Sequence, residues 1–280
     1  MDRYRGRLAA LGTKHGKERA IAPPLARRLG LTVTVADFDT DTLGTFSGEV
    51  ERPAPPRETV LLKARRAAEV SGLPLALASE GSFGPHPALP WLPCGHELLA
   101  FVDLETGLAL VESRISLRTT HGQMTARDLD GAAGFLGRIG FPRTAVIVRP
   151  NAGPGGIMKG VTDPATLADA IRTAAAASGD GTARIETDMR AHLNPMRMGE
   201  IRKLAARLAR RLATACPACG SPGFGSDGPV PGLPCGWCGA PTGAPLGERW
   251  SCPACGHAEV RTAPHHPTVA DPGHCAECNP

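Results

Sequence analysis

Residues 216–220 and 252–256 both read CPACG, residues 235–238 read CGWC, and residues 275–278 read CAEC. Eight of the nine cysteines therefore lie in four CxxC turns within the last 65 of 280 residues. A CxxC turn places two thiolates on one side of a tight loop, which is half of a tetrahedral metal site. Four turns predict a small zinc-ribbon-like domain with two four-cysteine sites. Their ligands are Cys216, Cys219, Cys235, Cys238, Cys252, Cys255, Cys275 and Cys278.

Zn2+ is the expected occupant of both sites. Soft thiolates in a closed tetrahedral arrangement favour it, and four evenly built turns do not favour an iron–sulfur cluster or disulfides. With cysteine in every ligand position, both ions would be structural. We favour a nested pairing, first turn with fourth and second with third, which would pack Trp237 and Trp250 into a compact ribbon. A sequential pairing remains open.

The bulk composition indicates a globular protein without a membrane segment. A composition of 42% hydrophobic and 21% charged residues is ordinary for such proteins, and no apolar run reaches 18 residues. The N-terminal stretch MDRYRGRLAALGTKHG lacks the apolar core of a signal peptide. We therefore expect a cytoplasmic protein, since a reducing compartment keeps thiols available for metal.

Charge is distributed unevenly along the chain. The net charge is +4, yet residues 216–280 contain two arginines, no lysine and five acidic residues. Each zinc ion with four thiolates would add a formal charge of about −2. A surface this negative argues against nucleic acid as a partner and leaves a protein partner of the zinc tail open.

Apolar periodicity divides the chain into an α/β domain, residues 1–213, and a zinc-binding tail, residues 214–280. An amphipathic helix over 198–213 forms the link. We predict a mixed sheet covered by helices. The expected strands are 8–13, 31–36, 73–78, 98–102, 108–112, 144–149 and 183–187, and the expected helices are 18–29, 57–71 and 164–178.

Polar residues gather after the first and third expected strands. Thr13, His15 and Lys17 lie in the turn that opens the first helix, where free N–H groups and the helix dipole favour an anion. Glu80 follows the strand 73–78 and precedes small residues that leave room for a ligand. The alternatives are an ordinary helix start for the first group and a turn carboxylate for Glu80.

A third polar group lies in residues 186–195, which read ETDMRAHLNP. Asp188 and Arg190 in this segment suit the binding of metal and phosphate. A buried salt-bridge cluster that docks the zinc tail is the alternative.

The stretches TKHGKE, GTFSGEVERP, ASEGSFGPHP and ETDMRAHLNP, together with the four CxxC turns, resemble an uncharacterised bacterial family known as a domain of unknown function. The likeness covers nearly the whole chain. It implies no assigned activity.

Residues 8–103 also resemble the inosine/xanthosine triphosphate pyrophosphatases. Thr13, His15 and Lys17 are similar to the family's triphosphate-binding turn, with His in place of Asn. Residues 58–64 match its Glu-x4-Lys-Ala helix, and residues 79–82 are similar to its acidic turn, with Ser79 replacing an acid. The resemblance implies that Glu58 and Glu80 hold Mg2+ and that Lys17 and Lys63 contact phosphates.

Two functions follow as hypotheses. The first is a Mg2+-dependent nucleotide phosphohydrolase acting on a phosphorylated small molecule, with Glu58, Glu80 and Asp188 as catalytic residues. Its phosphate ligands would be Thr13, His15, Lys17, Lys63 and Arg190. The second is a non-enzymatic zinc-ribbon module that recognises a protein or nucleic acid. Carboxylates that converge beside Lys17 would favour the enzyme.

Overall fold

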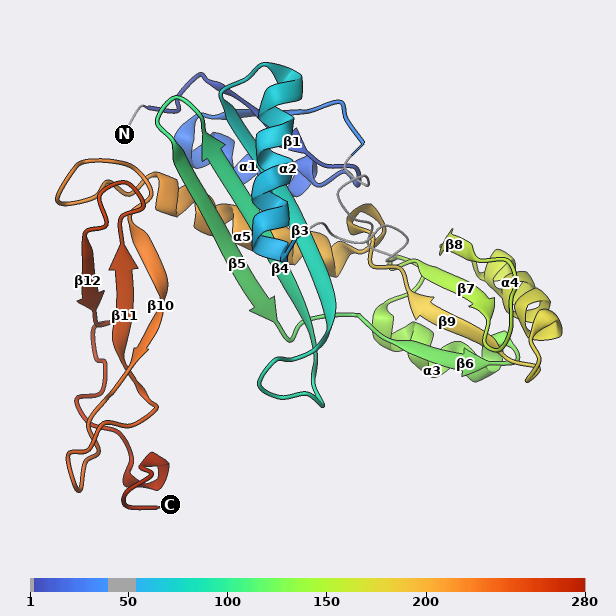
Figure 1. Cartoon of the computed structure of the whole chain (residues 1–280). Helices are drawn as coiled ribbons and strands as arrows, with labels where there is room; N and C mark the ends of the chain where they lie inside the picture. The colour runs from blue at the N-terminus through green and yellow to red at the C-terminus, as the bar shows by residue number, and fades with distance from the viewer. Residues whose placement is uncertain (1–2, 40–53, 280) are drawn as a thin grey trace. The chain divides into compact units, whose positions relative to one another are not determined.

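The computed structural model describes residues 3–39 and 54–279 (Figure 1). The GTFSGEVERP stretch lies outside these ranges. The chain divides into two compact units, one up to Leu208 and the other from Ala209 onward. None of the described helices is both long and apolar enough to span a membrane.

The first unit contains a five-stranded mixed sheet, sheet A, with strand order β2-β1-β3-β4-β5. Strand β1 is parallel to β2 and β3, whereas β3, β4 and β5 are antiparallel. The predicted α/β fold with a mixed sheet is confirmed. Its strands are β1 (Leu8–Gly12), β2 (Thr32–Val35), β3 (Leu75–Pro85), β4 (Pro93–Asp103) and β5 (Leu108–Ser116).

Helices α1 (Glu18–Leu29) and α2 (Pro56–Ser71) cover opposite faces of sheet A (Figure 1). Strand β1 lies between β2 and β3, so the crossover through α1 leads from β1 to β2 and the crossover through α2 leads back past β1 to β3. Because of this strand order, the carboxyl end of β1 is a topological switch point, where open α/β sheets commonly bind ligands. Alanines on α2 pack against alanines on β1, β3 and β4, which brings α2 close to the sheet.

A second sheet, sheet B, has strand order β6-β9-β7-β8 and is antiparallel throughout. Helices α3 and α4 supply its apolar core. The sequence pattern missed β6, α3 and β8, because β6 and β8 span only four residues each and α3 contains three glycines. The elements are β6 (Gln123–Ala126), α3 (Leu129–Ile139), β7 (Val146–Pro150), β8 (Met158–Val161), α4 (Pro164–Ala177) and β9 (Ala183–Thr187).

Helix α5 (Pro195–Leu212) follows a short 3-10 turn (Ala191–Leu193) and is held to sheet A by ion pairs. Arg197 Nε donates to Glu97 Oε1 of β4 at 2.6 Å, with both side chains buried. Arg207 pairs with Glu112 of β5 at 2.6 Å. Two basic residues of this helix therefore anchor it to sheet A.

The second unit is built on a three-stranded antiparallel sheet of β10 (Gly225–Pro231), β11 (Pro245–Ser251) and β12 (Ala258–Arg261), followed by a 3-10 turn (Pro272–His274). Its small core groups Phe224 with Trp250 and two cysteines. The Arg261 guanidinium lies 4.3 Å from the Trp250 ring centroid, which covers one side of the indole.

The close approach of α5 to β3 predicts that Gly81→Ala destabilises the first unit. A Cβ at Gly81 would collide with Arg197 Nη2 and lie 2.8 Å from Glu97 Oε2. Displacing a buried ion pair costs roughly 3–5 kcal/mol when one charge is left unpaired, so we expect a loss of about 2–4 kcal/mol.

Urea unfolding of the zinc-loaded protein measures this loss. Gly84→Ala is the matched control on the same strand, because nothing lies within 4 Å of its Cβ position. Equal free energies of unfolding for the two variants would contradict the prediction that a side chain at Gly81 displaces the Arg197–Glu97 pair.

Candidate metal centres and a buried polar cluster

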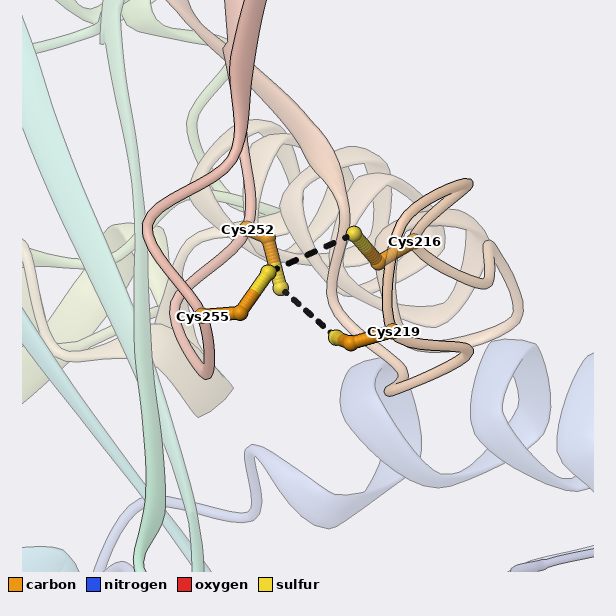
Figure 2. A group of neighbouring side chains, drawn as sticks. All are labelled: Cys216, Cys219, Cys252 and Cys255. Carbon is orange, nitrogen blue, oxygen red and sulfur yellow. Dashed lines mark hydrogen bonds between the residues drawn. The ribbon is translucent and has the colours of Figure 1, made fainter.

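The first and third CxxC turns form one four-cysteine group. Figure 2 shows the four side chains pointing toward a common centre from two separate loops. Cys216 Sγ lies 3.8 Å from Cys255 Sγ, and Cys219 Sγ lies 3.7 Å from Cys252 Sγ. All four sulfurs lie within 4.8 Å of one another.

The second and fourth turns form the other group with nearly the same geometry. Cys235 Sγ lies 3.8 Å from Cys278 Sγ, and Cys238 Sγ lies 3.7 Å from Cys275 Sγ. A zinc ion with Zn–S bonds of about 2.3 Å requires sulfurs roughly 3.8 Å apart at the corners of a tetrahedron. Both groups fit Zn2+, and both can hold a metal ion.

Local backbone contacts explain why each turn presents its thiols together. The N–H groups of Gly220, Gly239 and Gly256 donate to the carbonyl of the first cysteine of their turn at 2.9–3.0 Å. These three glycines have φ between 72° and 75°, a region that favours glycine. A glycine after the second cysteine therefore lets each of these three turns close.

The nested pairing was wrong, and so was the sequential alternative, because the turns pair alternately. Strands β10 and β11 form a hairpin in which Gly225 faces Ser251, so the turns just before β10 and just after β11 meet at its open end. The turn at 235–238 lies in the loop of that hairpin and pairs with the last turn of the chain. Trp237 is 81% exposed and does not pack into the ribbon, whereas Trp250 does.

Several predicted ligand residues of the first unit lie together and buried at the carboxyl end of β1. Lys17, at the N-cap of α1, donates from Nζ to Ser79 Oγ at 3.0 Å and approaches the Ser79 carbonyl at 3.5 Å. Lys63 of α2 forms an ion pair with Glu80 of β3, with both side chains buried. The structure thus brings Lys17, Lys63 and Glu80 to one region.

The predicted end of the third strand needs correction. Glu80 does not follow a strand but lies inside β3, which runs to Pro85 and is paired with β4 over its whole length. Strand β1 pairs with β3 only as far as Ala78, so β3 extends past the end of β1. Ser79 and Glu80 reach the α1 turn because of this difference in strand length.

Two residues that the sequence did not single out complete the cluster. Glu97 of β4 and Arg197 of α5 are buried partners, and the Arg197 guanidinium also lies 5.0 Å from the Phe83 ring centroid. Charged residues at inward positions of an apolar strand and helix were the available signal. Their pairing across 100 residues could not be read from periodicity.

Lys17 is the unusual member of the cluster. Burial and, to a lesser degree, the Arg197 charge lower its pKa to about 8, although Glu97 and Glu80 act in the opposite direction. Among the described residues no carboxylate forms an ion pair with it. The hydroxyl of Thr13, four residues earlier, is buried without a hydrogen-bond partner.

The remaining predicted residues lie in other settings. Glu58 is exposed on the first turn of α2, and the rings of His15 and His192 stack with centroids 5.3 Å apart. Asp188 is fully buried and accepts from Arg190 Nη2 at 2.6 Å, which raises the pKa of the guanidinium. Within residues 3–39 and 54–279, only the two cysteine groups bring three or more metal-ligating side chains together.

The fold and these groups define an α/β protein with a C-terminal unit that has two potential four-cysteine metal sites. The chain belongs to the family described as a domain of unknown function, DUF6671, whose model matches residues 63–280. The predicted membership in a family of unknown function with a cysteine-rich tail is confirmed. No curated protein matches the chain. The likeness to triphosphate pyrophosphatases is not shown by these comparisons.

Alternate pairing predicts which thiols become reactive when one ligand is lost. In Cys219→Ser we expect rapid alkylation of Cys216, Cys252 and Cys255, because the first group loses its metal while the second keeps it. Peptide mass spectrometry after a short pulse of iodoacetamide measures this pattern.

Cys238→Ser is the reciprocal control and should release Cys235, Cys275 and Cys278. Reactivity of Cys275 and Cys278 in Cys219→Ser would indicate the nested pairing instead. Reactivity of Cys235 and Cys238 would indicate the sequential one.

Proposed function

We propose that the protein binds two Zn2+ ions and that both are structural. The sulfur–sulfur distances of 3.7–3.8 Å in each group carry this proposal, since they match the edges of a zinc–thiolate tetrahedron. Four thiolates fill each coordination shell and leave no position for water or substrate. The ions therefore hold the second unit together and take no part in catalysis.

Zinc removal should unfold the second unit and leave the first folded. Binding of structural zinc to cysteine sites supplies on the order of 10 kcal/mol, which a small unit cannot replace. We expect two zinc ions per chain by elemental analysis, and proteolysis confined to residues after 213 once a strong chelator is added.

Cys94→Ser is the control, because Cys94 is buried in the first unit and belongs to neither group. It should retain both ions. A second unit that resists protease without metal would refute the structural role.

A second function that we propose is the binding of a small phosphorylated or sulfated anion beside Lys17, and separate observations support it. Lys17, Lys63 and Arg197 carry three positive charges against the two carboxylates of Glu80 and Glu97, so the buried cluster has a positive excess. Among the described residues, Lys17 is a buried cation without a carboxylate partner and Thr13 has a buried hydroxyl without a hydrogen-bond partner, and a bound ion explains both features. Their place at the switch point and at the N-terminus of α1 agrees with that reading.

Anion binding at Lys17 should weaken as pH rises through about 8, the pKa of this side chain. The ammonium form binds the anion, so above that pH a proton must first be taken up, and affinity falls by about tenfold per pH unit. Sulfate is the probe for calorimetry because it does not itself titrate in this range.

Lys17→Met should abolish this pH-dependent binding without lowering the free energy of unfolding, because it removes a buried charge that has no ion-pair partner. Lys14→Met, in the same turn but exposed and paired with Asp39, is the matched control. Sulfate binding that persists unchanged in Lys17→Met would exclude this site.

Nucleotide hydrolysis with Mg2+ stays a prediction from the sequence. Glu80 is paired with Lys63, Asp188 with Arg190, and Glu58 is exposed, so the described geometry adds no support to a carboxylate metal site. A protein partner for the second unit likewise stays a prediction.

A further inference from the structure

A cleft of about 500 Å3 lies in the first unit, and none of the residues of the Lys17 cluster lines it. Three segments form it. They are the chain after β5 with Arg118, the end of α3 and the loop after it with Arg138 and Arg143, and the first turns of α5 with Glu200 and Lys203. Gly137 of α3 and Gly199 of α5 also line it. Its volume is in the range of small-molecule sites.

The cleft has a large positive excess. Four of its lining side chains are cationic and only one, Glu200, is acidic. Glu200 already accepts from Lys203 Nζ at 2.6 Å and from Arg114 Nε at 2.9 Å. Burial raises the pKa of Glu200, but these hydrogen bonds outweigh it and hold the pKa below its usual value.

Three guanidinium groups on the cleft are left without an acidic partner. None of Arg118, Arg138 and Arg143 forms an ion pair with a carboxylate in the described part of the chain. Arg138 also lies 5.7 Å from the Phe135 ring centroid and sits in the last turn of α3, where it complements the helix dipole. Arg118 and Arg143 have no such structural role.

We propose that this cleft binds a small molecule carrying two or more phosphoryl or carboxylate groups. Planar guanidinium groups bind such groups with paired charge-assisted hydrogen bonds, and two or three around one hollow match more than one anionic group. The start of α5, at Pro195 and Met196, also lines the cleft, and the dipole of this helix favours an anion there.

The lining favours a small molecule over a nucleic acid. It contains no aromatic side chain on which a base could stack, and its cations surround a hollow instead of following a strip along the surface. The proposal does not rest on anion binding at Lys17, because the two sites share no residue.

Calorimetry of the zinc-loaded protein with tripolyphosphate and with citrate tests the proposal, the first probe carrying phosphoryl groups and the second carboxylates. We expect one of them to bind with a stoichiometry of one. Arg118→Gln/Arg143→Gln should weaken binding by roughly tenfold or more, since the loss of a single charge-assisted bond costs about a factor of ten.

The double variant Arg28→Gln/Arg57→Gln is the matched control. It removes the same charge from exposed arginines of α1 and α2 that do not line the cleft, and its affinity should equal that of the wild type. Lys17→Met should also retain this binding, which separates the cleft from the Lys17 site.

Three results would overturn the proposal. They are no binding of either probe to the wild type, an equal loss in both double variants, or an oligonucleotide that binds more tightly than both probes through Arg118 and Arg143. The last would assign the cleft to a nucleic acid.

Discussion

Cross-linking through the cysteine groups is the constraint on which the second unit depends. Apart from cysteines, few of its side chains after α5 are both apolar and buried, chiefly Phe224, Leu233 and Ala270. A core of this size is far below what offsets the conformational entropy of some seventy residues. Alternate pairing places one group at the open end of the β10–β11 hairpin and the other at its loop. Both ends of one ribbon are thereby fixed, and the segment before the last turn is held beside Cys235 by the Ala270 backbone.

The first unit is constrained differently, by charges that are buried and must find partners. Lys63 with Glu80 and Arg197 with Glu97 satisfy each other across elements far apart in the sequence. Such pairs add little net stability, because desolvation cancels much of their attraction, but an incorrect docking of α5 would leave Glu97 and Arg197 unpaired, which is costly. The Arg197–Glu97 pair therefore specifies where α5 lies on sheet A. Gly81 is part of the same arrangement, since only a residue without a side chain leaves room for the guanidinium.

Periodicity was sufficient for the elements that bury one long face. Helix α1 has the predicted bounds, and α2 begins one residue earlier than predicted. Strand β4 includes the predicted strand but is longer. It failed where elements are short, as in β6 and β8, and where β3 continues past the apolar run through Glu80. The eight ligand cysteines could be read from spacing alone. Their partners could not, because pairing depends on which ends of a hairpin meet. Glu97 and Arg197 were missed for the same reason: a buried polar pair is defined by contact between distant segments.

The family match begins at Lys63, in the middle of α2, and this position cannot be a structural boundary. Strand β3 lies inside the match and forms its parallel pairing with β1, which lies outside. Without β1, strand β3 would lie at an unpaired edge of sheet A. Helix α2 would also lose part of the alanine surface on which it packs. The matched segment therefore needs residues before 63 to complete sheet A. The same reasoning joins Lys17 to the remaining cluster, because Ser79, which accepts from the Lys17 ammonium, and the residues that shift its pKa all lie within the matched segment.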